Sequence, residues 1–271
     1  MPEGGRLLDA GAFLGTFGLG VMRKKRTAFA CFVEGNADLI AALEENLDRN
    51  ARCPFYICHS VLAGERGIQI AGSMEEGNLG SMSFAPSVSA GSVGTRLPEL
   101  RDKFGDFDLV KLDIEGLEAD VLRCDIEWVA NGGAAFLIEC NERPASLELG
   151  ALLLSTKVPL YYFAFPSFNP RNFRGNSIPI FDFAYEADLV LSPHGEPKLD
   201  RHLARNDCIL RPIHSVAELK RALWETPRFG LSTWRGAKNA VEAALAGREY
   251  LSHDFVSFLT EPEQKIATDH A

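Results

Sequence analysis

The feature that most constrains the fold of this chain is an alternation of two hydrophobic patterns. Short apolar runs of strand length are followed by segments in which apolar residues recur every three or four positions, as on one face of a helix. In the first half of the chain, the strand-like runs lie at residues 6–10, 27–33, 54–58, 107–113 and 134–139. Strands that alternate with helices indicate βαβ units, so the sequence predicts the α/β class with a mostly parallel sheet.

The second half of the chain departs from this alternation. Apolar runs at 159–165 and 187–191 flank a long loop and predict a hairpin that gives the sheet an antiparallel edge. Two segments with helical spacing follow, at residues 216–224 and 236–245. We therefore expect one domain over residues 1–200 and a helical extension over residues 201–271 that packs on the same domain.

Charge and hydropathy exclude several classes of protein. The 271 residues carry a formal net charge of -9, with a pI near 5.2. This balance disfavours a nucleic-acid partner, because phosphate contacts need clustered cations. Apolar runs long enough to span a bilayer, and the features of a signal peptide, are both missing, so we expect a soluble cytoplasmic protein without a membrane partner. The histidines have no metal-ligand spacing, and the oligomeric state is left open.

A glycine-containing turn follows the first strand-like run. It reads Asp9-Ala10-Gly11-Ala12-Phe13-Leu14-Gly15, whose glycine spacing differs from the Gly-x-Gly-x-x-Gly of dinucleotide binders. An acid before the glycines would repel a pyrophosphate but suits a ligand with an ammonium or sulfonium. A tight strand-to-helix turn without a ligand is the alternative interpretation.

The second strand-like run also ends in an acid, within Val33-Glu34-Gly35-Asn36. A carboxylate at this point of a βαβ unit can accept both hydroxyls of a ribose. Alternatively, Asn36 caps the next helix and Glu34 lies favourably near the helix dipole. Both interpretations can hold at once.

A third cluster of acids ends the run at 107–113. Asp113, Glu115 and Glu118 fall within six positions, where a strand passes into a helix. The carboxyl ends of parallel strands form the edge at which open α/β sheets bind ligands. An acidic first helical turn explains one of these residues, but it does not explain why Asp113 ends an apolar strand.

Together these segments resemble the class I S-adenosylmethionine-dependent methyltransferases, and specifically the FkbM family. Residues 9–15 are similar to the family's Asp-x-Gly-Ala-Asn-x-Gly motif, with Phe13 in place of the Asn. Residues 33–36 correspond to Val-Glu-Pro-Asn, and residues 111–118 match Lys-x-Asp-x-Glu-Gly-x-Glu. The resemblance covers residues 7–141. It implies a Rossmann-like fold with a seven-stranded sheet, an antiparallel edge strand and helices on both faces, and makes residues 1–200 the methyltransferase domain.

The resemblance also implies an S-adenosyl-L-methionine site, and the reaction we favour is O-methylation of a hydroxyl on a small molecule or glycan. The cofactor would contact Asp9, Gly11, Phe13, Gly15, Glu34, Gly35, Asn36, Ser60 and Asp113. Among these, Glu34 would bind the ribose hydroxyls and Ser60 the adenine. A hydroxyl acceptor needs a base, for which Asp113, Glu115 and Glu139 are the catalytic candidates; Asp113 is more suited to orienting the cofactor.

The loop at 166–182 is the candidate for acceptor binding, because long loops in compact domains are often functional. Asn169, Asn172 and Arg174 suit a polyhydroxylated small molecule or glycan. The alternative is an ordered loop whose amides satisfy its own backbone. For the whole protein, a catalytically silent S-adenosylmethionine-binding or partner-binding role, and a less favoured NAD-dependent oxidoreductase, stay open.

Overall fold

The computed structural model describes residues 1–65, 69–73, 83–86, 92–114, 116–172, 174–178, 183–201, 203, 207–228 and 236–260. The chain divides into two compact units. Unit 1 comprises residues 1–139, 155–158 and 190–196, and unit 2 comprises residues 140–154, 159–189 and 197–271.

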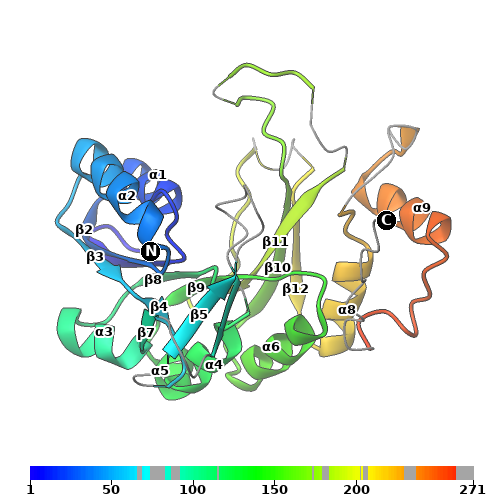
Figure 1. The fold of residues 1–271 in the computed structure, drawn as a ribbon. Coiled ribbons are helices and arrows are strands. Elements are labelled where there is room, and N and C mark those ends of the chain that lie inside the picture. The colour runs from blue at the N-terminus through cyan, green and yellow to red at the C-terminus, as the bar shows by residue number, and fades with distance from the viewer. Residues whose placement is uncertain are drawn as a thin grey trace, which may run out of the picture. The chain divides into compact units, whose positions relative to one another are not determined.

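Unit 1 contains the alternating strands and helices predicted from the sequence (Figure 1). Its elements are β1 (Gly5–Ala10), α1 (Thr16–Lys24), β2 (Thr27–Glu34), α2 (Ala37–Asn50), β3 (Phe55–His59), β4 (Val61–Leu62), β5 (Gln69–Ser73), β6 (Ser83–Pro86), β7 (Ser92–Thr95), α3 (Leu97–Phe104), β8 (Leu109–Leu112), α4 (Glu118–Arg123), α5 (Ile126–Asn131) and β9 (Ala135–Glu139). Strands β4, β5, β6 and β7 form a separate small sheet in the order β4-β7-β5-β6.

Five strands of unit 1 run parallel in the order β9-β8-β1-β2-β3. Ala10 of β1 is in register with Val33 of β2 and with Leu112 of β8. The carboxyl ends of these strands therefore meet at one edge of the sheet, which is the edge where the sequence places its acidic residues.

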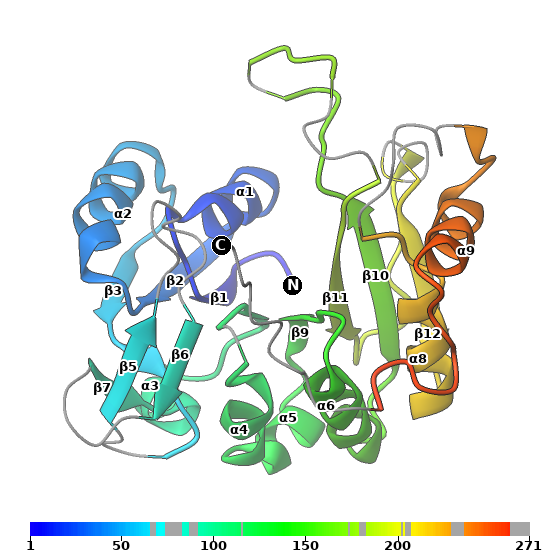
Figure 2. The ribbon, with the colours of Figure 1, turned by 45° about the vertical axis from the view of Figure 1, so that its right-hand side comes forward.

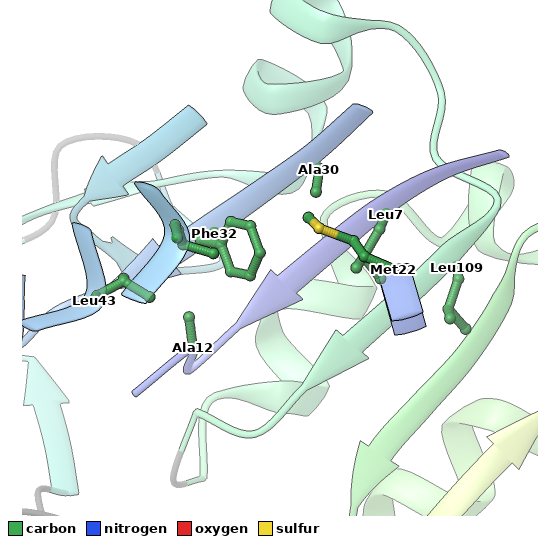
Figure 3. Close-up of a cluster of buried hydrophobic side chains, with 8 residues drawn as sticks. Leu7, Ala12, Met22, Ala30, Phe32, Leu43 and Leu109 are labelled. Carbon is green, nitrogen blue, oxygen red and sulfur yellow. The ribbon is translucent and has the colours of Figure 1, made fainter. Parts of the chain in front are cut away.

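Helices cover both faces of this part of the sheet (Figure 2). Leu7 on β1, and Ala30 and Phe32 two positions apart on β2, point to the side of the sheet that α1 and α2 cover. There they pack with Met22 and Leu43 in the hydrophobic core (Figure 3). On the opposite face, the Phe29 ring lies 5.1 Å from the Phe104 ring of α3. The expected α/β fold with helices on both faces is confirmed.

Unit 2 contains α6 (Pro144–Ser155, except its last residue), β10 (Leu160–Pro166), most of β11 (Tyr185–Leu191), β12 (Ile209–Ile213), α8 (Val216–Trp224) and α9 (Ala240–Tyr250). Strand β12 pairs antiparallel with β10. Within the described ranges the main sheet thus has eight strands, in the order β12-β10-β11-β9-β8-β1-β2-β3. The sequence predicted seven, and it assigned the edge to the hairpin of 159–165 with 187–191; the edge strand is β12.

Segments that are distant in sequence are joined inside unit 2 by polar contacts. The Tyr162 hydroxyl donates to the Thr226 hydroxyl at 3.0 Å. Both carboxylate oxygens of Glu142 accept hydrogen bonds from the Arg248 guanidinium, and Arg228 donates to the Cys140 carbonyl at 2.9 Å. Residues 201–271 therefore hold a strand as well as helices, and the boundary at residue 200 stays a prediction.

Within the described residues, the structure contains no helix that is both long and apolar enough to cross a membrane.

Candidate functional site

Acidic residues from four strands of unit 1 gather at the carboxyl edge of its parallel sheet. Asp9 lies near the end of β1, Glu34 ends β2, Asp113 directly follows β8, and Glu139 ends β9. The Asp113 N–H donates to the Ala10 carbonyl at 3.0 Å, so the chain leaving β8 is fixed against the end of β1. The structure thus brings together the acids that the sequence singled out at separate positions.

The turn after β1 has room for glycine alone at its first position. Gly11 has a φ of +74°, and a Cβ there would lie 1.7 Å from the Asp113 carbonyl oxygen. Its N–H donates to the Val33 carbonyl at 3.0 Å, which fixes the turn over the end of β2. Phe13 has a φ of 51°, a left-handed conformation that is rare for a bulky residue. Its side chain is 38% exposed.

Asp9 is fully buried beneath this turn. Its Oδ2 accepts the Gly18 N–H at 3.0 Å, within the first turn of α1. Its Oδ1 has no hydrogen-bond partner among the residues that the structure describes. Burial raises the pKa of Asp9 to about 6, with smaller opposing contributions from the nearby Lys111 ammonium and the Gly18 N–H. A buried acceptor without a partner requires an explanation, and a ligand donor would supply one.

Glu34 joins the glycine turn to the start of α2. Its Oε2 accepts the Phe13 N–H and its Oε1 accepts the Asn36 N–H, both at 2.7 Å. Asn36 also caps α2, because its Oδ1 accepts the Asp38 N–H at 3.0 Å. The capping interpretation of this segment is therefore confirmed, while each carboxylate oxygen of Glu34 keeps a second lone pair for a ligand. In the described part of the chain, the buried Nδ2 of Asn36 has no acceptor.

The acidic segment after β8 divides into residues with different roles. The Lys111 ammonium donates to Asp113 Oδ2 at 2.8 Å. Glu118 is buried and folds back over its own loop, accepting the Ile114 N–H at 3.2 Å and the Gly116 N–H at 3.0 Å. Burial raises the pKa of Glu118, and these N–H donors oppose that effect. The glutamate of the predicted motif thus holds the loop in shape.

The other two candidate bases are Glu115 and Glu139. Glu115 lies outside the described residues. Glu139, at the end of β9, is partly buried, and its role as base stays a prediction.

Ser60 lies beside Glu34 at the same edge. Its N–H donates to the Glu34 carbonyl at 3.1 Å, and its hydroxyl lies 2.8 Å from the Thr95 hydroxyl. Thr95 is not among the site residues predicted from the sequence. A hydroxyl next to Ser60 could be found only once the pairing of β4 with β7 was known, because it aligns Thr95 with Leu62.

The amides of the 166–182 loop satisfy the backbone of the loop itself. Asn172 Nδ2 donates to the carbonyls of Asn169, at 3.1 Å, and Asn176, at 2.7 Å, and its Oδ1 accepts the Asn176 N–H at 3.0 Å. Asn169 Oδ1 accepts the Arg171 N–H at 2.9 Å. These contacts are those of the alternative interpretation, an ordered loop. Binding of an acceptor by Asn169, Asn172 and Arg174 stays a prediction.

Among the described residues, no group of three or more His, Cys, Asp or Glu side chains is arranged to hold a metal ion.

No family model and no curated protein sequence matches this chain. It is similar to the solved structure of the methyltransferase FkbM from Methylobacillus flagellatus KT, with 17% identity and a TM-score of 0.41 over 56% of this chain; it spans only 37% of that chain. It is also similar to precorrin 8W decarboxylase from Methanobacterium thermoautotrophicum, with 14% identity, a TM-score of 0.43, and coverage of 70% of this chain and 82% of that chain.

A putative tRNA (m1A22) methyltransferase from Streptococcus pneumoniae is similar over more of the chain. It has 13% identity and a TM-score of 0.43, covering 98% of this chain and 86% of that chain. All three TM-scores lie below 0.5, so these structures do not decide what this chain binds or does.

Proposed function

We propose that this chain is a class I S-adenosylmethionine-dependent methyltransferase. The observation that carries the proposal is that two carboxylates, those of the buried Asp9 and of Glu34, lie beside the same glycine turn. An acid beneath the turn disfavours phosphate and favours a cationic group, and an acid at the end of β2 favours ribose hydroxyls. A nucleoside that carries a positive charge fits both requirements.

Further polar atoms of the site fit the same cofactor. Asp9 Oδ1 is a buried acceptor and Asn36 Nδ2 a buried donor, and neither has a partner in the described part of the chain. The Ser60 and Thr95 hydroxyls, 2.8 Å apart, can both donate and accept towards an adenine. The cofactor, when bound, would supply an electrophilic methyl group.

We further propose that the acceptor is a hydroxyl of a small molecule or glycan. Its proton would pass to a carboxylate at the same edge, and Glu139 and Glu115 are the candidates. Asp113 is paired with Lys111, which suits it to hold a ligand group in place more than to take a proton. The acidic net charge also disfavours an acceptor rich in phosphate. Location in the cytoplasm is a further part of the proposal.

Calorimetric titration with S-adenosylmethionine tests the cofactor assignment. Gly11→Ala should abolish binding, because its Cβ would overlap the Asp113 carbonyl oxygen. Gly133→Ala is the matched control: its φ of +75° imposes the same left-handed strain, but no atom lies within 4 Å of the added Cβ. The control should therefore bind normally. A folded native protein that binds NAD but not S-adenosylmethionine would reject the proposal.

Transfer of a labelled methyl group to hydroxylated compounds in a cell extract, read by mass spectrometry, tests the reaction. Glu139→Gln should lower turnover while leaving cofactor affinity unchanged, because a base acts on the acceptor. Cofactor binding without transfer to any acceptor would instead indicate a catalytically silent binding protein.

A further inference from the structure

Lys111 places a single cation between two carboxylates of the site. Its ammonium lies 2.8 Å from Asp113 Oδ2, and the two side chains are 18% and 40% exposed, respectively. Lys111 is also in register with Asp9 on the neighbouring strand β1. Registered residues of parallel strands project to the same face. Lys111 therefore has one carboxylate on the neighbouring strand, Asp9, and one two residues further along its own chain, Asp113.

This arrangement is complementary to an α-amino acid. The amino-acid end of S-adenosylmethionine carries a carboxylate and an ammonium on one carbon atom. A lysine ammonium has three N–H donors, so Lys111 can bond to Asp113 and to a ligand carboxylate at the same time. Two acceptors at this end of the strands suit the ligand ammonium: Asp113, which follows β8, and Oδ1 of Asp9, which is buried and has no partner within the described ranges.

We propose that Lys111 binds the α-carboxylate of the cofactor while Asp9 and Asp113 bind its α-ammonium. This inference rests on the proposed function and extends it, by assigning the group that distinguishes the amino-acid end of the cofactor from a simple amine. A lysine that served only to hold Asp113 in place would show no dependence on the ligand carboxylate.

The test compares two ligands that differ only in that carboxylate: S-adenosylmethionine and decarboxylated S-adenosylmethionine. The native protein should bind the first about tenfold to a hundredfold more tightly, the range expected for one hydrogen bond between charged groups. Lys111→Met should weaken S-adenosylmethionine by a similar factor and leave decarboxylated S-adenosylmethionine within about threefold, so that the preference disappears. Lys111→Arg keeps the cation and should keep most of the preference.

Each result separates the possible roles of Lys111. Equal weakening of both ligands in Lys111→Met would overturn the proposal, since it would mean that the lysine acts only on Asp113. A native protein that binds both ligands equally would also overturn it, and this measurement needs no variant that has to fold. If the native protein binds neither ligand, the proposed function itself fails, a pattern distinct from both of the others.

Discussion

At the scale of single residues, the most consequential contacts are those of Glu34. Each of its carboxylate oxygens accepts one backbone N–H, from Phe13 and from Asn36. The residue therefore has a structural role before any ligand arrives. Replacing it changes the shape of the site and its chemistry together, so loss of cofactor binding alone cannot identify the ribose contact.

Glu34→Gln should destabilise the protein even without cofactor. A glutamine has one acceptor oxygen, so its NH₂ group must face one of the two backbone N–H donors. The free energy of unfolding should fall by about 1–3 kcal/mol, the cost of a buried donor left unsatisfied. Denaturant unfolding measures this, with the exposed Glu45→Gln on α2 as a control that should change stability little. Equal stability of both variants would contradict the role assigned to Glu34.

Asp9 should make the stability of the ligand-free protein fall as pH rises. Its pKa is about 6 in the folded protein, against 3.8 for the ordinary side chain, so the unfolded chain releases the proton first. The stabilisation is complete below pH 4 and is lost up to about pH 6; the difference between the two pKa values corresponds to roughly 3 kcal/mol.

Asp9→Asn, which does not titrate, should therefore gain stability relative to the native protein between pH 4 and pH 6. Thermal or urea unfolding across this interval measures the difference. A difference that does not vary with pH would show that Asp9 does not titrate in the native protein as assigned.

The sequence predicted which acids would meet but not what each of them contacts. Asp9 and Glu34 were recognisable because each lies at the end of an apolar strand followed by small residues. Glu118 reads equally well as a helix-dipole residue, and only the three-dimensional loop shows its carboxylate accepting the Ile114 N–H. Lys111 lies in an apolar strand, and its neighbours depend on a register with β1 that no local pattern contains.

At the scale of elements, α1 depends on close approach to the sheet at one glycine. A Cβ on Gly18 would lie 2.4 Å from the Phe32 ring, whereas no atom lies within 4 Å of a Cβ on Gly20. Both residues belong to the same helix.

The two glycines therefore form a matched pair. Gly20→Ala should raise the free energy of unfolding by about 0.5–1 kcal/mol, since alanine costs less backbone entropy in a helix. Gly18→Ala should lower it by about 1–3 kcal/mol, since the core must move to accept the added methyl group. Urea unfolding of both variants decides between them; stabilisation by both would mean that α1 does not pack on Phe32 as described.

Elements with strong periodicity were predicted well, and those with weak patterns were missed. Helix α8 was expected at its observed bounds because apolar residues recur at helical spacing over residues 216–224. Strand β12 was missed because Arg211 and Pro212 interrupt its apolar pattern. Proline is tolerated there because β12 is an edge strand, which needs hydrogen bonds on one side only.

At the scale of the whole molecule, neither unit is a continuous piece of chain. Unit 2 combines residues 140–154 and 159–189 with residues beyond 197. A cut at residue 200 would remove β12 from β10, the Thr226 partner of Tyr162, and the Arg248 partner of Glu142.

A chain truncated after residue 200 should therefore fail to fold as a stable domain. The partly exposed Glu142 carboxylate would lose its bidentate partner, Tyr162 would lose its hydroxyl partner, and β10 would lose the strand that pairs with it. Circular dichroism and thermal unfolding measure the result, and the full-length Arg248→Lys variant, which keeps the charge but loses the bidentate geometry, should show a smaller loss. A truncated chain that unfolds cooperatively, at the same midpoint temperature as the full-length protein, would establish residues 1–200 as an independent domain.

The pairing of β1 with β8 also dictates when the site can be assembled during synthesis. These strands are neighbours in the sheet, yet β1 ends at Ala10 and β8 begins at Leu109. A ribosome releases the chain from its N-terminus, so β1 and β2 emerge long before β8, and the edge of β1 that β8 covers stays unpaired until then. Pairings this far apart in sequence form slowly. Asp9 and Lys111 therefore meet only after most of unit 1 has been made, and a nascent chain that stalls before β8 exposes an apolar strand edge open to aggregation.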